Sequence, residues 1–278
     1  MKLILGDNAI SGVNHANLKK ATDAFKKYGE IDAVVEYLHL LQSLGVESFS
    51  YTTTDKMNVA LKKFIIQGGK LKLYPALPYA HTYASLLGEV GPTGMLRSLV
   101  PANFGSLVSI LRMIRGDITG LLRLLISREI PTELRPNVKT VFLNNIFTDS
   151  LLASRRSQYL DQFSQSVADL LPDSSTGFMT MNHVRLEKQL DLNGNSATIC
   201  SIINRLGFRM NPDQGQVETC LRRPSSRPVY AMSILASGEI DFKDAIGYVG
   251  QFERIKAVLI SSSNEFRIRE MRENIANA

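Results

Sequence analysis

The chain has 278 residues, of which 44% are hydrophobic and 21% charged, so it has the composition of a globular protein with one large domain or two small ones. Its net charge of +6 comes from basic residues scattered in ones and twos without interleaved aromatic side chains, which argues against a nucleic-acid partner. Two cysteines give no disulfide framework. No apolar run is long enough to span a membrane, and the first one is too short for a signal peptide, so we expect a cytoplasmic protein.

Strand-like and helix-like segments alternate along the chain, beginning with a strand at residues 2–5 and a helix at residues 31–44. The other expected strands are residues 46–51, 71–77, 139–143, 177–181, 198–203, 228–234 and 256–260. The other expected helices are residues 55–67, 81–87, 152–171, 184–190, 212–221, 242–252 and 265–274. Pro212 is expected as the first residue of its helix, a position that proline favours.

Eight strands alternating with eight helices predict a parallel sheet with helical crossovers, and eight such units close a barrel. We therefore expect a single (β/α)8 TIM barrel over residues 1–278. A doubly wound open sheet is the alternative, but residues 6–12 lack the G-x-G-x-x-G spacing that a dinucleotide-binding sheet of that type usually carries after its first strand.

Residues 88–136 interrupt the alternation and are expected to form a helical insertion between the third helix and the fourth strand. Within them, residues 106–130 predict two amphipathic helices separated near Gly116. The apolar residues on their faces are Leu107, Ile110, Leu111, Ile114, Ile118, Leu121, Leu122 and Leu125. The pair is expected to pack on the barrel wall, to cover the site as a lid, or to form a homo-oligomer interface.

Polar side chains gather after the carboxyl ends of the expected strands, which is the end of a barrel that carries the active site. Four residues are predicted to be catalytic: His81 and His183 transfer protons, and His15 and Asp7 position the substrate. The residues predicted to bind substrate are Asn8, Asn145, Asn204, Arg205 and Ser233. Three histidines in this set make a divalent metal an alternative, but no H-x-H or H-E-x-x-H spacing assigns a ligand.

The loop after the last expected strand is predicted to bind phosphate. It is short and rich in hydroxyl groups, and it leads into a helix whose N-terminal amides attract an anion. Barrels often hold a phosphate at this position. The predicted phosphate-binding residues are Ser261, Ser262, Ser263 and Asn264, and the alternative is that such residues only cap the helix.

Two segments resemble the aldo-keto reductase family. GVESFSYTTT at residues 45–54 is similar to the family's second strand, and IKAVLISSSNEFRIREMREN at residues 255–274 is similar to its last strand and cofactor-phosphate loop. The resemblance implies a barrel and a nicotinamide cofactor, but the family's catalytic tetrad is absent. Ser50 stands at the position of the catalytic Asp and Asp55 at that of the Tyr; the third strand ends without the Lys, and the fourth ends in Asn144-Asn145 where the family has His. The stretches GVNH, PYAH and GFRMNP also resemble uncharacterised microbial barrel proteins.

From these observations we expect an enzyme that acts on a small phosphorylated or carboxylated metabolite by acid/base chemistry of the lyase or isomerase type. One alternative is an NAD(P)-dependent oxidoreductase with a rebuilt site. Another is a barrel without catalysis that serves binding or assembly through residues 88–136. No motif assigns a cofactor, and both a divalent metal and NADP stay open.

Overall fold

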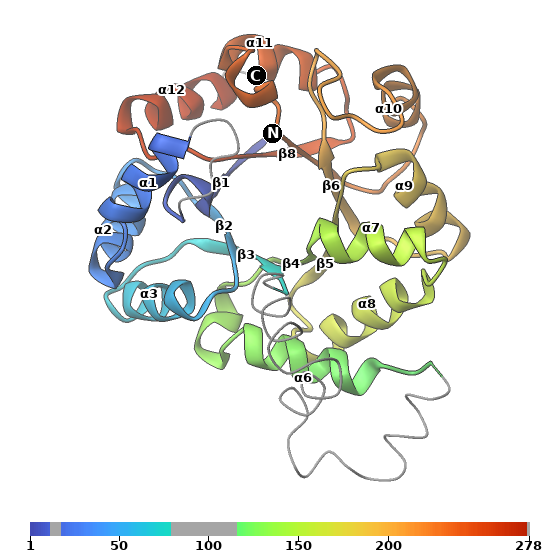
Figure 1. The fold of residues 1–278 in the computed structure, drawn as a ribbon, viewed down its shortest axis with the longest axis horizontal. Coiled ribbons are helices and arrows are strands. Elements are labelled where there is room, and N and C mark those ends of the chain that lie inside the picture. Colours follow the sequence, from blue (N-terminus) through green and yellow to red (C-terminus); the bar gives the residue numbers. More distant parts are fainter. Residues whose placement is uncertain (12–17, 79–115, 277–278) are drawn as a thin grey trace.

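The computed structural model of the protein describes residues 1–11, 18–78 and 116–276. Its centre is a closed barrel of eight parallel strands in chain order, and pairing of β1 with β8 closes it (Figure 1). The strands are β1 (Lys2–Gly6), β2 (Ser48–Thr52), β3 (Lys72–Leu77), β4 (Thr140–Leu143), β5 (Ser175–Thr180), β6 (Thr198–Ile202), β7 (Val229–Met232) and β8 (Ile255–Ile260). The closed barrel confirms the expected (β/α)8 fold, because an open sheet would leave two edge strands.

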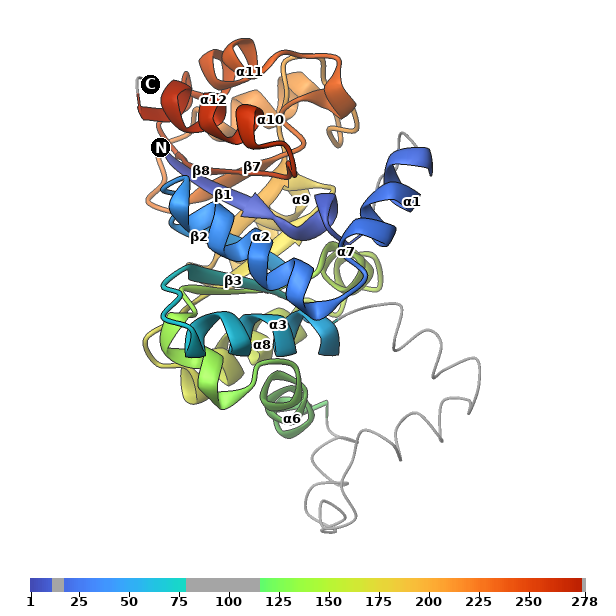
Figure 2. The ribbon, with the colours of Figure 1, turned by 90° about the vertical axis from the view of Figure 1, so that its left-hand side faces the viewer.

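Helices surround the barrel, and α1 projects beyond the carboxyl ends of the strands (Figures 1 and 2). The α-helices among the described residues are α1 (Leu18–Lys27), α2 (Ile31–Ser43), α3 (Asp55–Ile66), α6 (Thr119–Glu129), α7 (Asn145–Ala153), α8 (Gln158–Leu170), α9 (His183–Leu192), α10 (Gln214–Leu221), α11 (Phe242–Val249) and α12 (Glu265–Ala276). Short 3-10 turns lie at η1 (Asp7–Ala9), η3 (Thr132–Asn137) and η4 (Ala236–Gly238). No helix in this part of the chain is long and apolar enough to cross a membrane.

The strands separate two apolar layers, because successive side chains of a strand point to opposite faces. The barrel interior is filled by a cluster made of Ile4, Tyr74, Ala76, Phe142, Met179, Cys200 and Ala257. A larger core lies between the strands and the helical ring. A residue next to an interior side chain in a strand therefore faces the helices, as Ser201 beside Cys200 in β6 does.

The helix expected over residues 242–252 ends at Val249, and two other expected helices differ from the structure for a clear physical reason. The helix expected over residues 152–171 is two helices, α7 and α8, and Arg155 between them has a φ of +58°, which a helix does not tolerate. The helix expected from Pro212 begins at Gln214, because Asp213 is its N-cap and accepts a 2.8 Å hydrogen bond from the amide of Gln216.

The second half of the expected helical pair is α6, which packs along α8. It lies between α3 and α8 in the helical ring, where the crossover from β3 to β4 belongs (Figure 1). Ile126 and Ile130 are fully buried there, so α6 packs on the barrel wall. Residues 107–114 and the helix expected at residues 81–87 lie outside the described residues.

Candidate functional site

Asp7 is a buried carboxyl group at the carboxyl end of β1. It begins η1 and is only 6% exposed, and its Oδ2 accepts a 2.9 Å hydrogen bond from the backbone amide of Thr52 at the end of β2. Burial raises the pKa of Asp7 to about 6, although the Thr52 hydrogen bond acts in the opposite direction. Both protonation states of Asp7 are therefore accessible near neutral pH, which suits a group that transfers protons.

Gly6 leaves room for the side chain of Ser261 beside Asp7. A Cβ atom at this position would lie 2.7 Å from the Ser261 hydroxyl oxygen, which is closer than van der Waals contact allows. The sequence Gly6-Asp7 thus places the Ser261 hydroxyl next to a position without a side chain, beside a carboxyl group at the barrel's carboxyl end.

Two tyrosines of the core lie near Asp7. The Tyr37 hydroxyl donates a 2.7 Å hydrogen bond to the carbonyl oxygen of Ser262, whereas the buried Tyr51 hydroxyl has no hydrogen-bond partner among the described atoms. Burial raises the pKa of Tyr51, and the charges of Glu129 and Asp7 raise it further. The sequence reading missed Tyr51, because it continues the apolar pattern of its strand.

Glu129 is a second buried acid that the sequence reading missed. It is 7% exposed at the end of α6, and its carboxylate accepts a hydrogen bond from the Thr53 hydroxyl. Its backbone carbonyl also accepts a 3.0 Å hydrogen bond from the side-chain amide of Asn58 on α3. The sequence feature that could have indicated Glu129 is its position beside Ile130 at the end of an apolar segment. A charged side chain in such a segment is seldom buried without a partner.

His183, predicted to transfer protons, lies in the barrel wall instead of the barrel interior. It is 1% exposed at the start of α9, and its Nδ1 is 2.8 Å from the hydroxyl of Ser201. Ser201 follows the interior residue Cys200 in β6 and so faces the helices. His183 is thus buried between strand and helices, and its predicted proton transfer stays a prediction. His15 and His81 lie outside the described residues.

A buried polar cluster surrounds His183. Glu187 accepts hydrogen bonds from His183 Nε2 at 3.0 Å, from the Cys220 thiol at 2.8 Å and from the guanidinium of Arg254. Burial acts to raise the pKa of Glu187, but these three donors outweigh it and lower the pKa to about 2. Burial and the neighbouring carboxylate raise the pKa of Cys220 to about 12. Among the described residues, this is the cluster whose side chains could bind a metal ion.

The predicted substrate ligands after β6 and β7 have different surroundings. Asn204 is fully buried, and its side chain forms two 2.9 Å hydrogen bonds with the backbone of Phe208, so it holds the loop and does not face the mouth. Arg205 is exposed and pairs with Asp244 at 3.3 Å. Ser233 is exposed with a φ of +55°.

The two other predicted substrate ligands lie after β1 and β4. Asn8 is exposed in η1. Asn145 is the half-buried first residue of α7, and the preceding Asn144 caps that helix by accepting a 3.0 Å hydrogen bond from the amide of Ile146. Both predicted ligands therefore lie at the carboxyl end of the barrel, and their substrate contacts stay a prediction.

The predicted phosphate loop lies at the start of α12 and is partly occupied by its own side chains. Asn264 Oδ1 accepts a 3.0 Å hydrogen bond from the amide of Arg267, and Ser262 Oγ accepts one of 3.2 Å from the amide of Asn264. Ser262 is buried, Ser261 is half-buried, and Ser263 is exposed. One amide of this loop and one in the first turn of α12 are thus already bonded, and phosphate binding stays a prediction.

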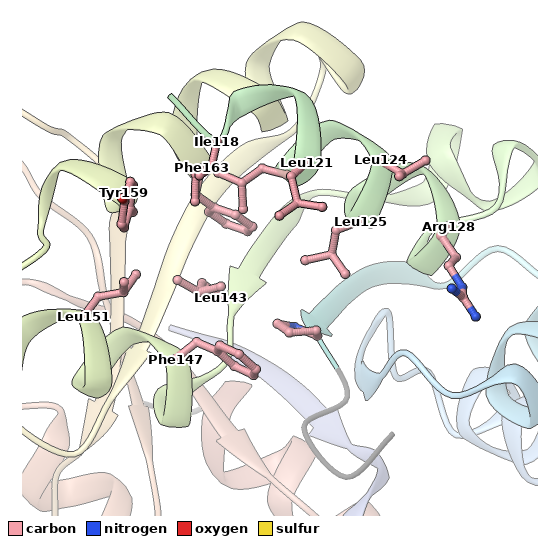
Figure 3. A pocket seen from close by; sticks show the side chains of 12 residues that line it. Ile118, Leu121, Leu124, Leu125, Arg128, Leu143, Phe147, Leu151, Tyr159 and Phe163 are labelled. Carbon is pink, nitrogen blue, oxygen red and sulfur yellow. The ribbon is translucent and has the colours of Figure 1, made fainter. Parts of the chain in front are cut away.

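An apolar pocket of about 220 Å³ lies between α6, α7 and α8 and the ends of β3 and β4 (Figure 3). The residues that line it are Pro78, Ile118, Leu121, Leu122, Leu124, Leu125, Arg128, Leu143, Phe147, Leu151, Tyr159 and Phe163. Such walls offer almost no polar group to orient a reacting substrate. We therefore place the candidate active site at Asp7.

No family model and no curated protein matches this chain. Among solved structures, a "putative aldo-keto reductase" from Pseudomonas aeruginosa is similar over 99% of this chain and 90% of its own, with a TM-score of 0.60 and 12% identity. A second solved structure, also of a "putative aldo-keto reductase" from that organism, is similar over 99% of this chain and 89% of its own. Its TM-score is 0.60 and its identity to this chain is 11%. The resemblance to aldo-keto reductases expected from the sequence is confirmed for the fold, and such low identity carries no reaction with it.

Proposed function

We propose that this barrel is an enzyme that acts by acid/base chemistry on a small anionic metabolite, in a reaction of the lyase or isomerase type. The observation that carries the proposal is Asp7, a 6% exposed carboxyl group whose pKa is raised to about 6 at the carboxyl end of a barrel strand. Perturbed carboxyl groups in this location are typical of catalytic sites in barrels.

In the proposed reaction, ionised Asp7 removes a proton from a carbon next to a carbonyl group of the substrate, and the electron pair of the broken C–H bond moves toward the carbonyl oxygen. The protonated carboxyl then returns the proton to a neighbouring carbon in an isomerisation, or to a leaving group in an elimination. The amide of Thr52 keeps the carboxylate oriented throughout.

We place the anionic group of the substrate at the loop of Ser261, Ser262, Ser263 and Asn264. Ser263 and Asn264 are exposed at the start of a twelve-residue helix, whose dipole favours an anion. Titration of isotope-labelled protein with inorganic phosphate should shift the amide signals of this loop, and unchanged signals would remove this part of the proposal.

The oxidoreductase alternative has less support. Ser50, at the position of the aldo-keto reductase aspartate, faces the barrel interior and donates a 3.0 Å hydrogen bond to the carbonyl oxygen of Tyr74. Asp55, at the tyrosine position, is exposed in the first turn of α3. A fluorescence titration with NADPH separates this alternative, because tight binding of the nucleotide would favour it over proton transfer.

The test is proton exchange in heavy water. Phosphorylated and carboxylated metabolites that raise the melting temperature are incubated with the protein in D2O, and loss of a C–H signal by NMR reports proton abstraction. Asp7→Asn should slow this exchange by about 100-fold or more while the metabolite still binds. Asp173→Asn removes an exposed carboxylate and serves as the control. If Asp7→Asn and the native protein exchange the proton at equal rates, the role of Asp7 is refuted. If none of the metabolites that bind exchanges a C–H proton, the proposed reaction is refuted.

A further inference from the structure

Three buried side chains of types that bind zinc converge in the barrel wall, away from the proposed active site. His183 and Glu187 lie one turn apart on α9, so they share a face of that helix. Cys220 comes from α10, which contacts α9 as its neighbour in the ring (Figure 1). One ligand atom from each of the three residues lies within 4.8 Å of the others. We propose that His183 Nε2, Glu187 Oε2 and Cys220 Sγ bind a zinc ion that links α9 to α10.

The second polar atom of His183 and that of Glu187 each have a hydrogen-bond partner, as is usual for residues that bind a metal. The second nitrogen of His183 contacts the Ser201 hydroxyl at 2.8 Å, and the second carboxylate oxygen of Glu187 accepts a hydrogen bond from Arg254. Such outer contacts fix the orientation of a histidine and a carboxylate that bind a metal. They leave His183 Nε2 and Glu187 Oε2 turned toward each other and toward the sulfur.

The distances require only a small adjustment. Zinc bond lengths at tetrahedral angles place nitrogen and oxygen ligands about 3.4 Å apart, and sulfur and oxygen ligands about 3.6 Å apart. The corresponding separations are 3.0 Å between His183 and Glu187 and 2.8 Å between Cys220 and Glu187. Each of these two pairs therefore opens by less than about 1 Å to admit the ion, and His183 Nε2 and Cys220 Sγ, which lie within 4.8 Å of each other, settle about 3.6 Å apart.

Binding of zinc removes one proton from the cluster and moves another within it. The thiol of Cys220 releases its proton to solvent, and the His183 proton moves from Nε2 to Nδ1, from which it is donated to the Ser201 hydroxyl. The thiolate and the carboxylate together offset the two charges of zinc, so the charge of Arg254, which Glu187 balances without the metal, becomes the net positive charge of the loaded cluster. A water molecule completes four-fold coordination.

The experiment uses Co2+ as a spectroscopic probe and Zn2+ as its competitor. Protein treated with a chelator and titrated with Co2+ should develop a thiolate-to-cobalt charge-transfer absorption band at one equivalent, and Zn2+ should displace it. Cys220→Ala should abolish the band, whereas Cys200→Ala, the matched change at the buried cysteine inside the barrel, should retain it. Ser201→Ala should weaken the affinity for Co2+ by about 10-fold to 100-fold.

The chain has only two cysteines, so a band that persists in Cys200→Ala identifies the sulfur even if Cys220→Ala fails to fold. Absence of a band in the native protein, together with no zinc retained after gel filtration, would overturn the proposal. The cluster would then be a hydrogen-bonded network only. A band that disappears in Cys200→Ala, or that survives in Cys220→Ala, would also overturn it.

Discussion

At the scale of single residues, Asp7 makes the stability of the fold depend on pH. Its pKa rises from the usual 3.8 to about 6 on folding, so between these pH values the folded state holds a proton that the unfolded chain has lost. The contribution of Asp7 is complete below about pH 4 and is lost as pH rises through 6, which amounts to roughly 3 kcal/mol. Urea unfolding between pH 4 and 7.5 should therefore find Asp7→Asn gaining stability relative to the native protein by about this amount.

The control for this prediction is Asp173→Asn, which removes a carboxylate that is exposed after α8. Both variants lose one negative charge, so a pH effect confined to Asp7→Asn comes from the environment of Asp7. A constant stability difference between Asp7→Asn and the native protein across this range would mean that Asp7 titrates normally in the folded state.

At the scale of an element, the loop after β6 depends on one side chain. Asn204 bonds both the amide and the carbonyl group of Phe208 at 2.9 Å, so Asn204→Ala leaves both groups without this partner. We expect a loss of about 1–3 kcal/mol in unfolding free energy. Trypsin should also cleave faster after Arg205 and Arg209, with cleavage after Arg156, in the exposed turn between α7 and α8, as the internal reference. Equal cleavage rates in Asn204→Ala and the native protein would show that the loop keeps its shape without the two hydrogen bonds of Asn204.

The helices and strands were predictable where the spacing of apolar residues and the glycine or proline at the end of a helix indicated the same boundary. Helix α2 ends at Ser43, two residues before Gly45, which has a φ of +72° that glycine adopts readily. The break between α7 and α8 carries no glycine or proline, and Arg155 adopts the positive φ instead. A sequence reading that depends on glycine and proline as stop signals cannot find such a break.

The site was predictable only in part, for a geometric reason. Apolar periodicity indicates where a strand ends, but it does not indicate whether the next polar side chain turns to the mouth or to the wall. Asp7 directly follows β1 and lies at the carboxyl end of the barrel as expected, and its catalytic role stays a prediction. His183 and Asn204 follow β5 and β6 within three residues, yet hydrogen bonds draw both side chains into buried structural networks.

At the scale of the whole molecule, closure of the barrel depends on filling its interior. The ring of Phe142 lies inside the barrel, 1% exposed, with its centroid 5.8 Å from that of Tyr230. Gly177 pairs with Phe142 across β4 and β5, so both positions face the same side of the sheet. Glycine at this position leaves room for the aromatic ring.

Gly177→Ala should therefore strain the barrel. The new Cβ atom would lie 2.2 Å from the Cε1 atom of Phe142, and a buried ring cannot move aside as a flexible side chain can. We expect a loss of about 1–3 kcal/mol in unfolding free energy, measured by urea denaturation. In a Phe142→Leu background the same change should cost less, because the clashing ring edge is gone, and the coupling between the two changes should be at least about 0.5 kcal/mol.

The control is Gly247→Ala on α11, where the new Cβ atom meets no atom within 4 Å. This change should instead stabilise the protein by about 0.5–1 kcal/mol. Additive losses at Gly177 and Phe142 would mean that the barrel adjusts its strands at this layer, and the interior would then tolerate a larger side chain than its packing implies.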